Sequence, residues 1–339
     1  MPSTAISTAT DASSSMSSGL GMPPMAATHL RYHTLDVFTR QRFAGNPLAV
    51  VQIPGDVALS QGQKLLIARE FNFSETVFLH ERQGGETTWK IDIFITTAEI
   101  PFAGHPTIGA ACLVLSQMPG YADAAGMIQG KFLTKAGEVR LKYSTTEGTA
   151  TADIPHNVHI HRGTLSRPRL LEMQPSIAML FSPTMPRVPE QMPVVSIVKG
   201  MTFALIEVDS LATLSAAVPG AFAVDVALDK DWDQSFVALY FYFRLPDSAD
   251  STRNLRTRMI EGGLEDPATG SAASALACFL SLAEGVTGQR LRYGITQGME
   301  MGRTSEIGVQ VALGKTEREV ESVQLSGAVV EVMEGRLAV

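Results

Sequence analysis

The chain has 339 residues, a formal net charge of -7 and 18% charged residues, and these values exclude several classes of protein. A mildly acidic chain without a basic run cannot neutralise several phosphates, so nucleic acid is not an expected partner. The sequence contains no apolar run of the roughly 18 residues that a membrane span needs, so we expect no membrane association. The length favours two packed halves over a single core.

Residues 1–28 differ in composition from the rest of the chain. They are rich in Ser, Ala, Thr and Met and lack the basic and apolar regions of a secretory signal, so we expect a disordered tail. Organelle import is only a minor alternative, because a transit peptide needs arginine and the first arginine, Arg31, follows this segment. Cys112 and Cys278 are too few for a disulfide scaffold and favour a cytoplasmic location.

The first half of the chain begins with strand patterns. Residues 33–39 and 48–53 read as strands around the turn at Gly45-Asn46-Pro47. Ser60 stands three residues before Gln63, a capping box that predicts a helix over 63–71. Residues 74–79 and 89–96 are the next predicted strands, and a loop over 99–105 follows.

The second half repeats this order. Its predicted elements are strands over 194–200 and 202–208, a helix over 210–218, a strand over 235–245, a helix ending near Gly285, and strands over 291–298, 307–313 and 327–335. The chain therefore reads as an α+β protein with more strand than helix.

Two segments about 160 residues apart resemble each other. Residues 101–115 (PFAGHPTIGAACLVL) and 265–280 (EDPATGSAASALACFL) both place a Pro- and Gly-rich turn before an Ala-rich helix. This similarity indicates an internal duplication. A helix N-terminus carries unpaired N–H groups and the positive end of the dipole, so two such ends facing one site would bind an anion or an enolate oxygen.

Five motifs, AGNPLAVV, AREFNFSETVF, IPFAGHPTIGAA, EDPATGSAAS and QGMEMGR, resemble in order those of the phenazine-biosynthesis isomerase family. The resemblance runs from about residue 32 to the C-terminus. It implies a diaminopimelate epimerase-like fold of two pseudo-symmetric halves, each a curled, mostly antiparallel sheet around a central helix. We expect halves at 29–150 and 151–325, and a strand over 326–339 that returns to the first half. The resemblance also implies a homodimer.

The resemblance further implies the site residues. The acid–base glutamate of the SET motif falls on Glu75, the histidine of the GHP motif on His105, and the aspartate of the DPATGS motif on Asp266. Backbone donors near Gly104, Gly270 and Ser271 would hold a substrate carboxylate or carbonyl, and Ser74 is a lesser contact. Each of the three catalytic candidates also has a structural alternative: a surface carboxylate for Glu75, a loop residue for His105 and a helix N-cap for Asp266.

These residues predict a cofactor-independent isomerase that moves a proton on a small carboxylate resembling dihydro-hydroxyanthranilate. An epimerase or racemase that uses the Glu75 and Asp266 carboxylates is one alternative, and a catalytically silent binding protein is another. A two-thiol racemase is disfavoured, because both cysteines lie inside apolar helices and Ala103 and Asp266 occupy the loop positions of reactive thiols.

The sequence predicts no metal, nucleotide or flavin site. His156, His159 and His161 form an HxxHxH run, but Asp153 is the only acidic residue near it in sequence, so the run is interpreted as a connector between the halves. The GMEMG segment, residues 298–302, is interpreted as structural, with its methionines filling the core between the halves.

Overall fold

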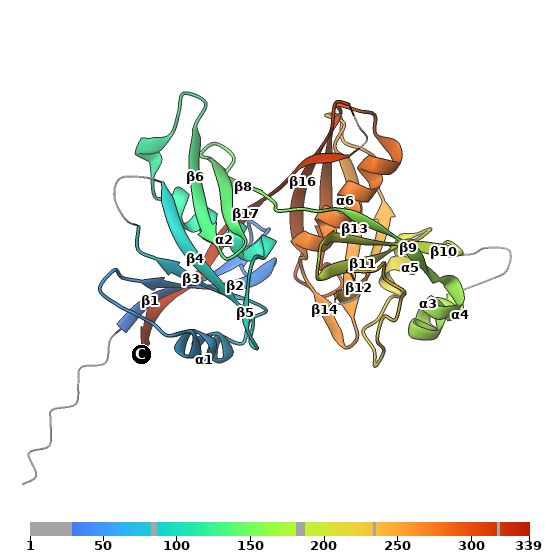
Figure 1. Cartoon of the computed structure of the whole chain (residues 1–339), viewed down its shortest axis with the longest axis horizontal. Coiled ribbons are helices and arrows are strands. Elements are labelled where there is room, and N and C mark those ends of the chain that lie inside the picture. The colour runs from blue at the N-terminus through green and yellow to red at the C-terminus, as the bar shows by residue number, and fades with distance from the viewer. Residues whose placement is uncertain (1–28, 83–86, 181–186, 233–234, 317–318) are drawn as a thin grey trace, which may run out of the picture.

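The computed structural model describes residues 29–82, 87–180, 187–232, 235–316 and 319–339. The predicted disordered tail over 1–28 lies outside these residues. The chain forms two lobes that lie side by side and are joined by the segment after β8 and by the long strand β17 (Figure 1). No helix within the described ranges is long and apolar enough to cross a bilayer.

The first lobe contains most of the first half of the chain. Its elements are β1 (His29–Val37), β2 (Asn46–Ile53), α1 (Gln61–Phe71), β3 (Thr76–His80), β4 (Thr88–Phe94), β5 (Glu99–Ile100), α2 (Gly104–Leu115), the 3₁₀ turn η1 (Pro119–Tyr121), β6 (Met127–Thr134), β7 (Gly137–Ser144) and β8 (Thr149–Asp153). The predicted capping box of α1 is confirmed, because the Ser60 hydroxyl accepts from the Gln63 N–H and Gln63 bonds back to the Ser60 N–H.

The second lobe contains the later elements. They are β9 (His159–Ser166), α3 (Arg167–Met173), α4 (Pro175–Leu180), β10 (Gln191–Val198), β11 (Met201–Glu207), α5 (Leu211–Ser215), β12 (Phe236–Arg244), β13 (Arg253–Glu261), β14 (Leu264–Asp266), α6 (Gly270–Glu284), β15 (Arg290–Gln297) and β16 (Ser305–Leu313). The last strand, β17 (Val320–Ala338), serves both lobes.

The two lobes have the same strand pairing. In the first, β1–β2 is antiparallel, β2–β3 parallel, β3–β4 and β4–β5 antiparallel, β4–β6 parallel and β6–β7 antiparallel. In the second, β10 to β16 repeat this series in the same order. Six matching pairings in sequence order support the internal duplication that the two similar turn–helix segments indicate.

A helix occupies the centre of each lobe. Every residue of α2 from His105 to Leu115 is buried, and α2 packs against strands on several sides, among them β1, β7, β8 and β17. The helix α6 is enclosed in the same way by β10, β11, β15, β16 and β17. An apolar helix without a polar face can be stable only when it is surrounded, so each sheet curls around its helix.

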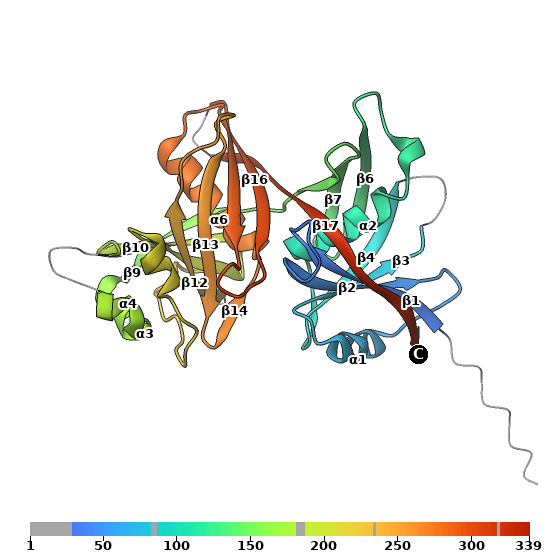
Figure 2. The same ribbon diagram turned by 180° about the vertical axis from the view of Figure 1, so that it is seen from behind.

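The strand β17 crosses from the second lobe to the first (Figure 2). The first part of β17 pairs with β16 and β8. Its last part, Val329 to Ala338, pairs in antiparallel orientation with His29 to Val37 of β1. In the second lobe β9 takes the corresponding place beside β10. Each lobe is therefore completed by a strand that the chain brings across from the other.

Candidate active site

The two turn–helix segments meet where the lobes join. β5 leads through residues 101–103 into α2, and β14 leads through 267–269 into α6. A Cβ placed on Gly104 would lie 3.5 Å from the Cα of Gly270, so the two helix starts are in contact. The N-caps, Ala103 and Thr269, make no side-chain bond to the first turn of either helix. The positive ends of two helix dipoles therefore converge on one place.

Both first helical positions require glycine. A Cβ on Gly104 would come within 2.7 Å of Leu325 Cδ2, and a Cβ on Gly270 within 2.8 Å of the same methyl group. Leu325 is a fully buried residue of β17. A single side chain of the crossing strand thus sets how closely the two helix starts approach.

Glu75 and His105 lie beside these helix starts. Glu75 directly precedes β3, and its Oε2 is 3.5 Å from Nδ1 of His105, the second residue of α2. The Glu75 side chain is 17% exposed and that of His105 5% exposed. Within the described residues, Glu75 Oε2 and His105 Nε2 are buried without a hydrogen-bond partner. Unpartnered buried polar atoms are uncommon in proteins, and a bound ligand or an ordered water would satisfy these two.

Asp266 reaches the same place from the second lobe. It is the last residue of β14, its Oδ1 accepts from Asn46 Nδ2 at 2.9 Å, and its Oδ2 accepts from the Thr269 hydroxyl at 2.6 Å. The expected N-cap role of Asp266 is wrong, because Thr269 is the N-cap of α6. The Asp-Pro pair belongs instead to the turn that connects strand and helix.

Burial shifts the pKa values of all three residues. It raises the pKa of Glu75 from 4.5 to about 7, against a hydrogen bond from Ser74. It raises the pKa of Asp266 from 3.8 to about 6, where the hydrogen bond from Thr269 opposes it and the charge of Glu75 adds to it. It lowers the pKa of His105 to about 4, although the charge of Asp266 acts in the opposite direction. Near neutral pH the imidazole is therefore neutral, Asp266 is ionised and Glu75 is close to half-protonated.

The predicted substrate contacts lie around this trio. Gly104 and Gly270 open the two helices, Ser271 is the partly buried second residue of α6, and Ser74 is an exposed residue bonded to Glu75. The structure thus brings together all the residues that the resemblance implies, from both lobes. Their functional roles remain predictions.

Three residues that the sequence analysis did not single out also belong to this region. They are Asn46, Thr269 and Gln297, which bond to Asp266 or to one another. Asn46 and Thr269 stood inside the GNP and DPATGS motifs, where they were interpreted as turn residues. Gln297 lies near the end of a predicted strand. It bonds to Asp266, 31 residues away in the chain, and no local sequence pattern predicts such a contact.

The contact between the lobes depends on Arg303 more than on the methionines of the GMEMG segment. Arg303 donates to Asp36 Oδ1 at 2.6 Å and to the carbonyls of Ala44 and Gly45 in the β1–β2 loop. Met299 is 46% exposed, so the prediction that these methionines fill the core between the lobes is wrong for Met299. Arg303, the last residue of the QGMEMGR motif, thus makes the contact between the lobes that was expected of the methionines.

The histidine run has an acidic neighbour that its sequence context does not reveal. His159 Nε2 lies 2.8 Å from Asp229 Oδ2, and His159, His161 and Asp229 place one ligand atom each within 4.8 Å of one another. His161 uses both ring nitrogens elsewhere, one with Ser196 and one with the Asp229 N–H. These bonds use the ring nitrogens of His161 that would bind a metal ion. We therefore interpret the cluster as a hydrogen-bonded group that stabilises the start of β9.

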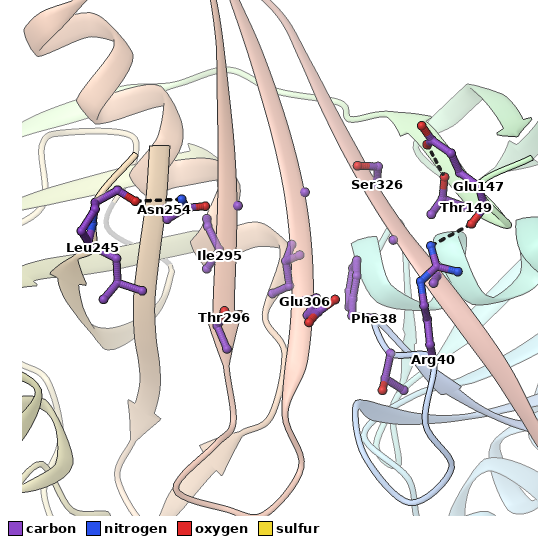
Figure 3. Close-up of a pocket in the computed structure, with 17 residues that line it drawn as sticks. Phe38, Arg40, Glu147, Thr149, Leu245, Asn254, Ile295, Thr296, Glu306 and Ser326 are labelled. Atoms are coloured by element: carbon purple, nitrogen blue, oxygen red, sulfur yellow. Dashed lines mark hydrogen bonds between the residues drawn. The ribbon is translucent and has the colours of Figure 1, made fainter. Parts of the chain in front are cut away.

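A pocket of about 640 Å³ lies between the lobes and contains none of the three predicted catalytic residues (Figure 3). Arg40, Glu147 and Thr149 line it from the first lobe, and Asn254 and Glu306 line it from the second. It also borders Ser326 on β17, next to Leu325, whose side chain lies against the starts of α2 and α6. Adjacent residues of a strand point to opposite faces, so this pocket is on the other face of β17 from the trio.

The fold defines the class of this protein. Two duplicated lobes, each a curled sheet around a helix, form the diaminopimelate epimerase-like fold, which solved structures share with this chain. The predicted fold class is confirmed.

A family profile described as "Phenazine biosynthesis-like protein" matches residues 35–335, and the chain belongs to this family. A Bacillus anthracis phenazine biosynthesis protein of the PhzF family superposes with a TM-score of 0.70 at 17% identity, over 92% of this chain and 100% of the other.

Two relatives give the class of reaction. The chain is 32% identical to an uncharacterized isomerase of Mesorhizobium japonicum, over 90% of this chain and 98% of the relative. It is 31% identical to the trans-2,3-dihydro-3-hydroxyanthranilate isomerase of Pseudomonas aeruginosa, also over 90% and 98%. The protein is an enzyme of the isomerase class, as predicted.

Proposed function

We propose that this enzyme moves a proton between two carbons of a small cyclic carboxylate, without a cofactor, and that trans-2,3-dihydro-3-hydroxyanthranilate or a close analogue is its substrate. The observation that carries the proposal is the state of Glu75. Its Oε2 is buried, has no hydrogen-bond partner among the described residues and lies 3.5 Å from Nδ1 of His105, and its pKa is raised to about 7. A base with a pKa near the working pH combines a usable ionised fraction with real proton affinity.

The proposed step conserves atoms and electrons. Glu75 removes a proton from an acidic C–H bond, and the electron pair of that bond shifts into the conjugated system of the substrate carboxylate. Glu75 then returns the same proton to another carbon, and a double bond moves along the ring. The starts of α2 and α6 stabilise the negative charge on the substrate oxygens, through first-turn N–H groups that carry no side-chain cap.

His105 and Asp266 orient the substrate in this proposal. The low pKa of His105 keeps the imidazole neutral, so it donates or accepts a hydrogen bond and can relay a proton. Asp266 accepts from an amino or hydroxyl group of the substrate. Racemisation by two thiols does not suit this chain, because Cys112 and Cys278 are buried and burial raises both thiol pKa values, that of Cys112 to about 12.

The test follows the substrate in D₂O by NMR with the wild type, Glu75→Gln and Glu138→Gln. Glu138 is an exposed carboxylate of β7 and serves as the matched control. We expect an isomerised product with wild type and with Glu138→Gln, and a loss of at least about 10²-fold with Glu75→Gln. Turnover that survives in Glu75→Gln removes Glu75 from the mechanism. If wild type exchanges deuterium into other carboxylates but leaves this one unchanged, the proposed substrate is wrong.

We propose further that the enzyme is a cytoplasmic homodimer. The family resemblance supports the dimer, and the two unpaired, buried cysteines agree with a reducing compartment. Light scattering of the purified protein tests the dimer, and a monomeric mass at micromolar concentration would refute it.

A further inference from the structure

A chain of hydrogen bonds runs through the second lobe to Asp266. The Tyr240 hydroxyl donates to Gln297 Oε1 at 3.1 Å, Gln297 Nε2 donates to Thr269 Oγ1 at 3.0 Å, and the Thr269 hydroxyl donates to Asp266 Oδ2 at 2.6 Å. Gln297 Nε2 also donates to the backbone carbonyl of Asp266 at 2.8 Å. Tyr240 and Gln297 are 0% exposed and Thr269 is 8% exposed, so water does not compete for these bonds.

The bonds that link Gln297, Thr269 and Asp266 have only one possible direction. The Asp266 carbonyl can only accept, so the Gln297 amide must turn its NH₂ group toward it. The same NH₂ group donates to Thr269, so the Thr269 oxygen is an acceptor and its single proton is left for Asp266. At the other end of the amide, Gln297 Oε1 accepts from the hydroxyl pair of Tyr240 and Thr257, which are also hydrogen-bonded to each other at 3.1 Å. The network therefore directs a hydrogen-bond donor at Asp266 Oδ2.

The second carboxylate oxygen is held in the same way from the other lobe. Asn46 Nδ2 donates to Asp266 Oδ1 at 2.9 Å and to the Ala268 carbonyl at 3.0 Å, and these two acceptors again leave the amide no alternative orientation. Glu75 differs, because its Oε2 has no hydrogen-bond partner within the described residues. Donors on both oxygens favour the ionised carboxyl group, and an unpartnered buried oxygen favours the protonated one.

We propose that Gln297, Thr269 and Asn46 are positioning residues that keep Asp266 an anion, so that the mobile proton of this site is carried by Glu75 alone. The inference rests on the proposed function and makes it more specific. Asp266 becomes a fixed acceptor for an N–H or O–H group of the substrate, and the backbone N–H of Ala268, which also bonds its carboxylate, helps to keep it ionised. The site then selects a carboxylate that also carries such a donor, and it uses one carboxylate as base rather than two.

The test measures protonation directly and needs no substrate. Protein labelled with ¹³C at the aspartate and glutamate carboxyl carbons is titrated by NMR, and the signals are assigned from Asp266→Asn and Glu75→Gln. In wild type we expect Asp266 to ionise at a lower pH than Glu75. Thr269→Val should raise the pKa of Asp266 by about one unit or more, Gln297→Met by less, and Thr269→Ser should restore the wild-type value.

Thr213→Val is the matched control, because the Thr213 hydroxyl makes a bond of the same length, 2.6 Å, to Asp209, which is not part of the hydrogen-bond chain to Asp266. It should shift Asp209 and leave Asp266 unchanged. The proposal is overturned if Glu75 ionises before Asp266 in wild type, or if Thr269→Val titrates like wild type. An enzyme that shows the expected titrations but no proton transfer would refute the proposed function and leave the positioning role standing.

Discussion

At the scale of single residues, the site is built from groups whose charged forms are disfavoured by burial. In the part of the chain that the structure describes, Glu75 and His105 each have one buried polar atom without a hydrogen-bond partner, whereas Asp266 has a donor on both oxygens. Burying ionisable groups costs folding free energy, and proteins commonly accept this cost at active sites. Glu75 is the residue for which this cost can be measured.

We expect Glu75→Gln to stabilise the protein at alkaline pH. At about pH 8.5 Glu75 is ionised in the folded and in the unfolded protein. The ionised form is disfavoured by burial only in the folded protein, where the pKa of Glu75 rises from 4.5 to about 7. At about 1.4 kcal/mol per pKa unit, this difference corresponds to about 3 kcal/mol in favour of the variant. As the pH falls from about 7 to 4.5 the folded wild type takes up the proton first, so its disadvantage disappears in this range. Urea unfolding at several pH values measures the difference.

Glu138→Gln is the control for this prediction and should change stability by less than about 0.5 kcal/mol at every pH. A stability difference between wild type and Glu75→Gln that does not vary with pH would contradict the raised pKa.

The pH dependence of catalysis should report the same group. A base must be ionised, so kcat/KM should level off above about pH 7, the pKa of Glu75, and fall about tenfold per pH unit below it, and more steeply below about pH 6, where Asp266 is protonated as well. A limb set by His105 would instead lie near 4. A pH–rate profile in a constant-ionic-strength buffer distinguishes them, and a flat profile between pH 5 and 8 would argue against Glu75 as the base.

At the scale of elements, the duplicated turn and helix is the unit that builds the site. β5 with α2 and β14 with α6 each bring a glycine to the same methyl group of Leu325. In this comparison Ala103 corresponds to Thr269, since both are N-caps, and Asp266 stands three residues before the N-cap of its helix. The two turns share a backbone but carry different side chains, which explains how a symmetric fold forms an asymmetric site.

Gly104→Ala and Gly270→Ala should each force the helix starts away from Leu325. A new Cβ at 2.7 or 2.8 Å from a fully buried methyl group is overpacked, at a cost of about 1–3 kcal/mol. Thermal unfolding measures the loss, and turnover should fall with it because the anion site widens. Gly120→Ala is the control, since a Cβ there meets nothing within 4 Å. Equal stability of all three variants would contradict the close contact.

At the scale of the whole molecule, the two lobes are held together by β17, by Asn46 reaching Asp266, and by Arg303 reaching the β1–β2 loop. Arg303 pairs with Asp36, whose side chain is 5% exposed. Asp36 also accepts from the Phe43 N–H, so the pair fixes the loop that leads to Asn46. The distance between the predicted catalytic groups of the two lobes therefore depends on a bond outside the site.

Arg303→Met should destabilise the protein by about 2–4 kcal/mol, because it leaves the buried Asp36 carboxylate without its cation. Asp36→Asn in the same chain should recover part of this loss, and the double-mutant cycle gives the coupling energy. Arg140→Met removes an exposed pair with Asp153 and should cost less than about 1 kcal/mol. If the effects of Arg303→Met and Asp36→Asn on the free energy of unfolding in urea are additive, the two residues are not coupled and their ion pair does not hold the lobes together.

Local patterns in the sequence determined much of this protein. The capping box at Ser60, the alternation of the strands and the repeated turn–helix segments depend on neighbours within a few residues, so they could be recognised without coordinates. The motif resemblance pointed to Glu75, His105 and Asp266 in the same way, one motif at a time.

Contacts between distant segments were decided only by the tertiary structure. Asn46 meets Asp266 across 220 residues, Arg303 meets Asp36 across 267, and Gln297 orients Thr269 from the neighbouring strand. None of these partners leaves a trace in sequence spacing, because the lobes exchange strands and the pairing depends on where β17 and β9 cross. Which carboxylate is held as an anion and which carries the proton follows from these contacts, since burial and hydrogen bonding set the pKa values.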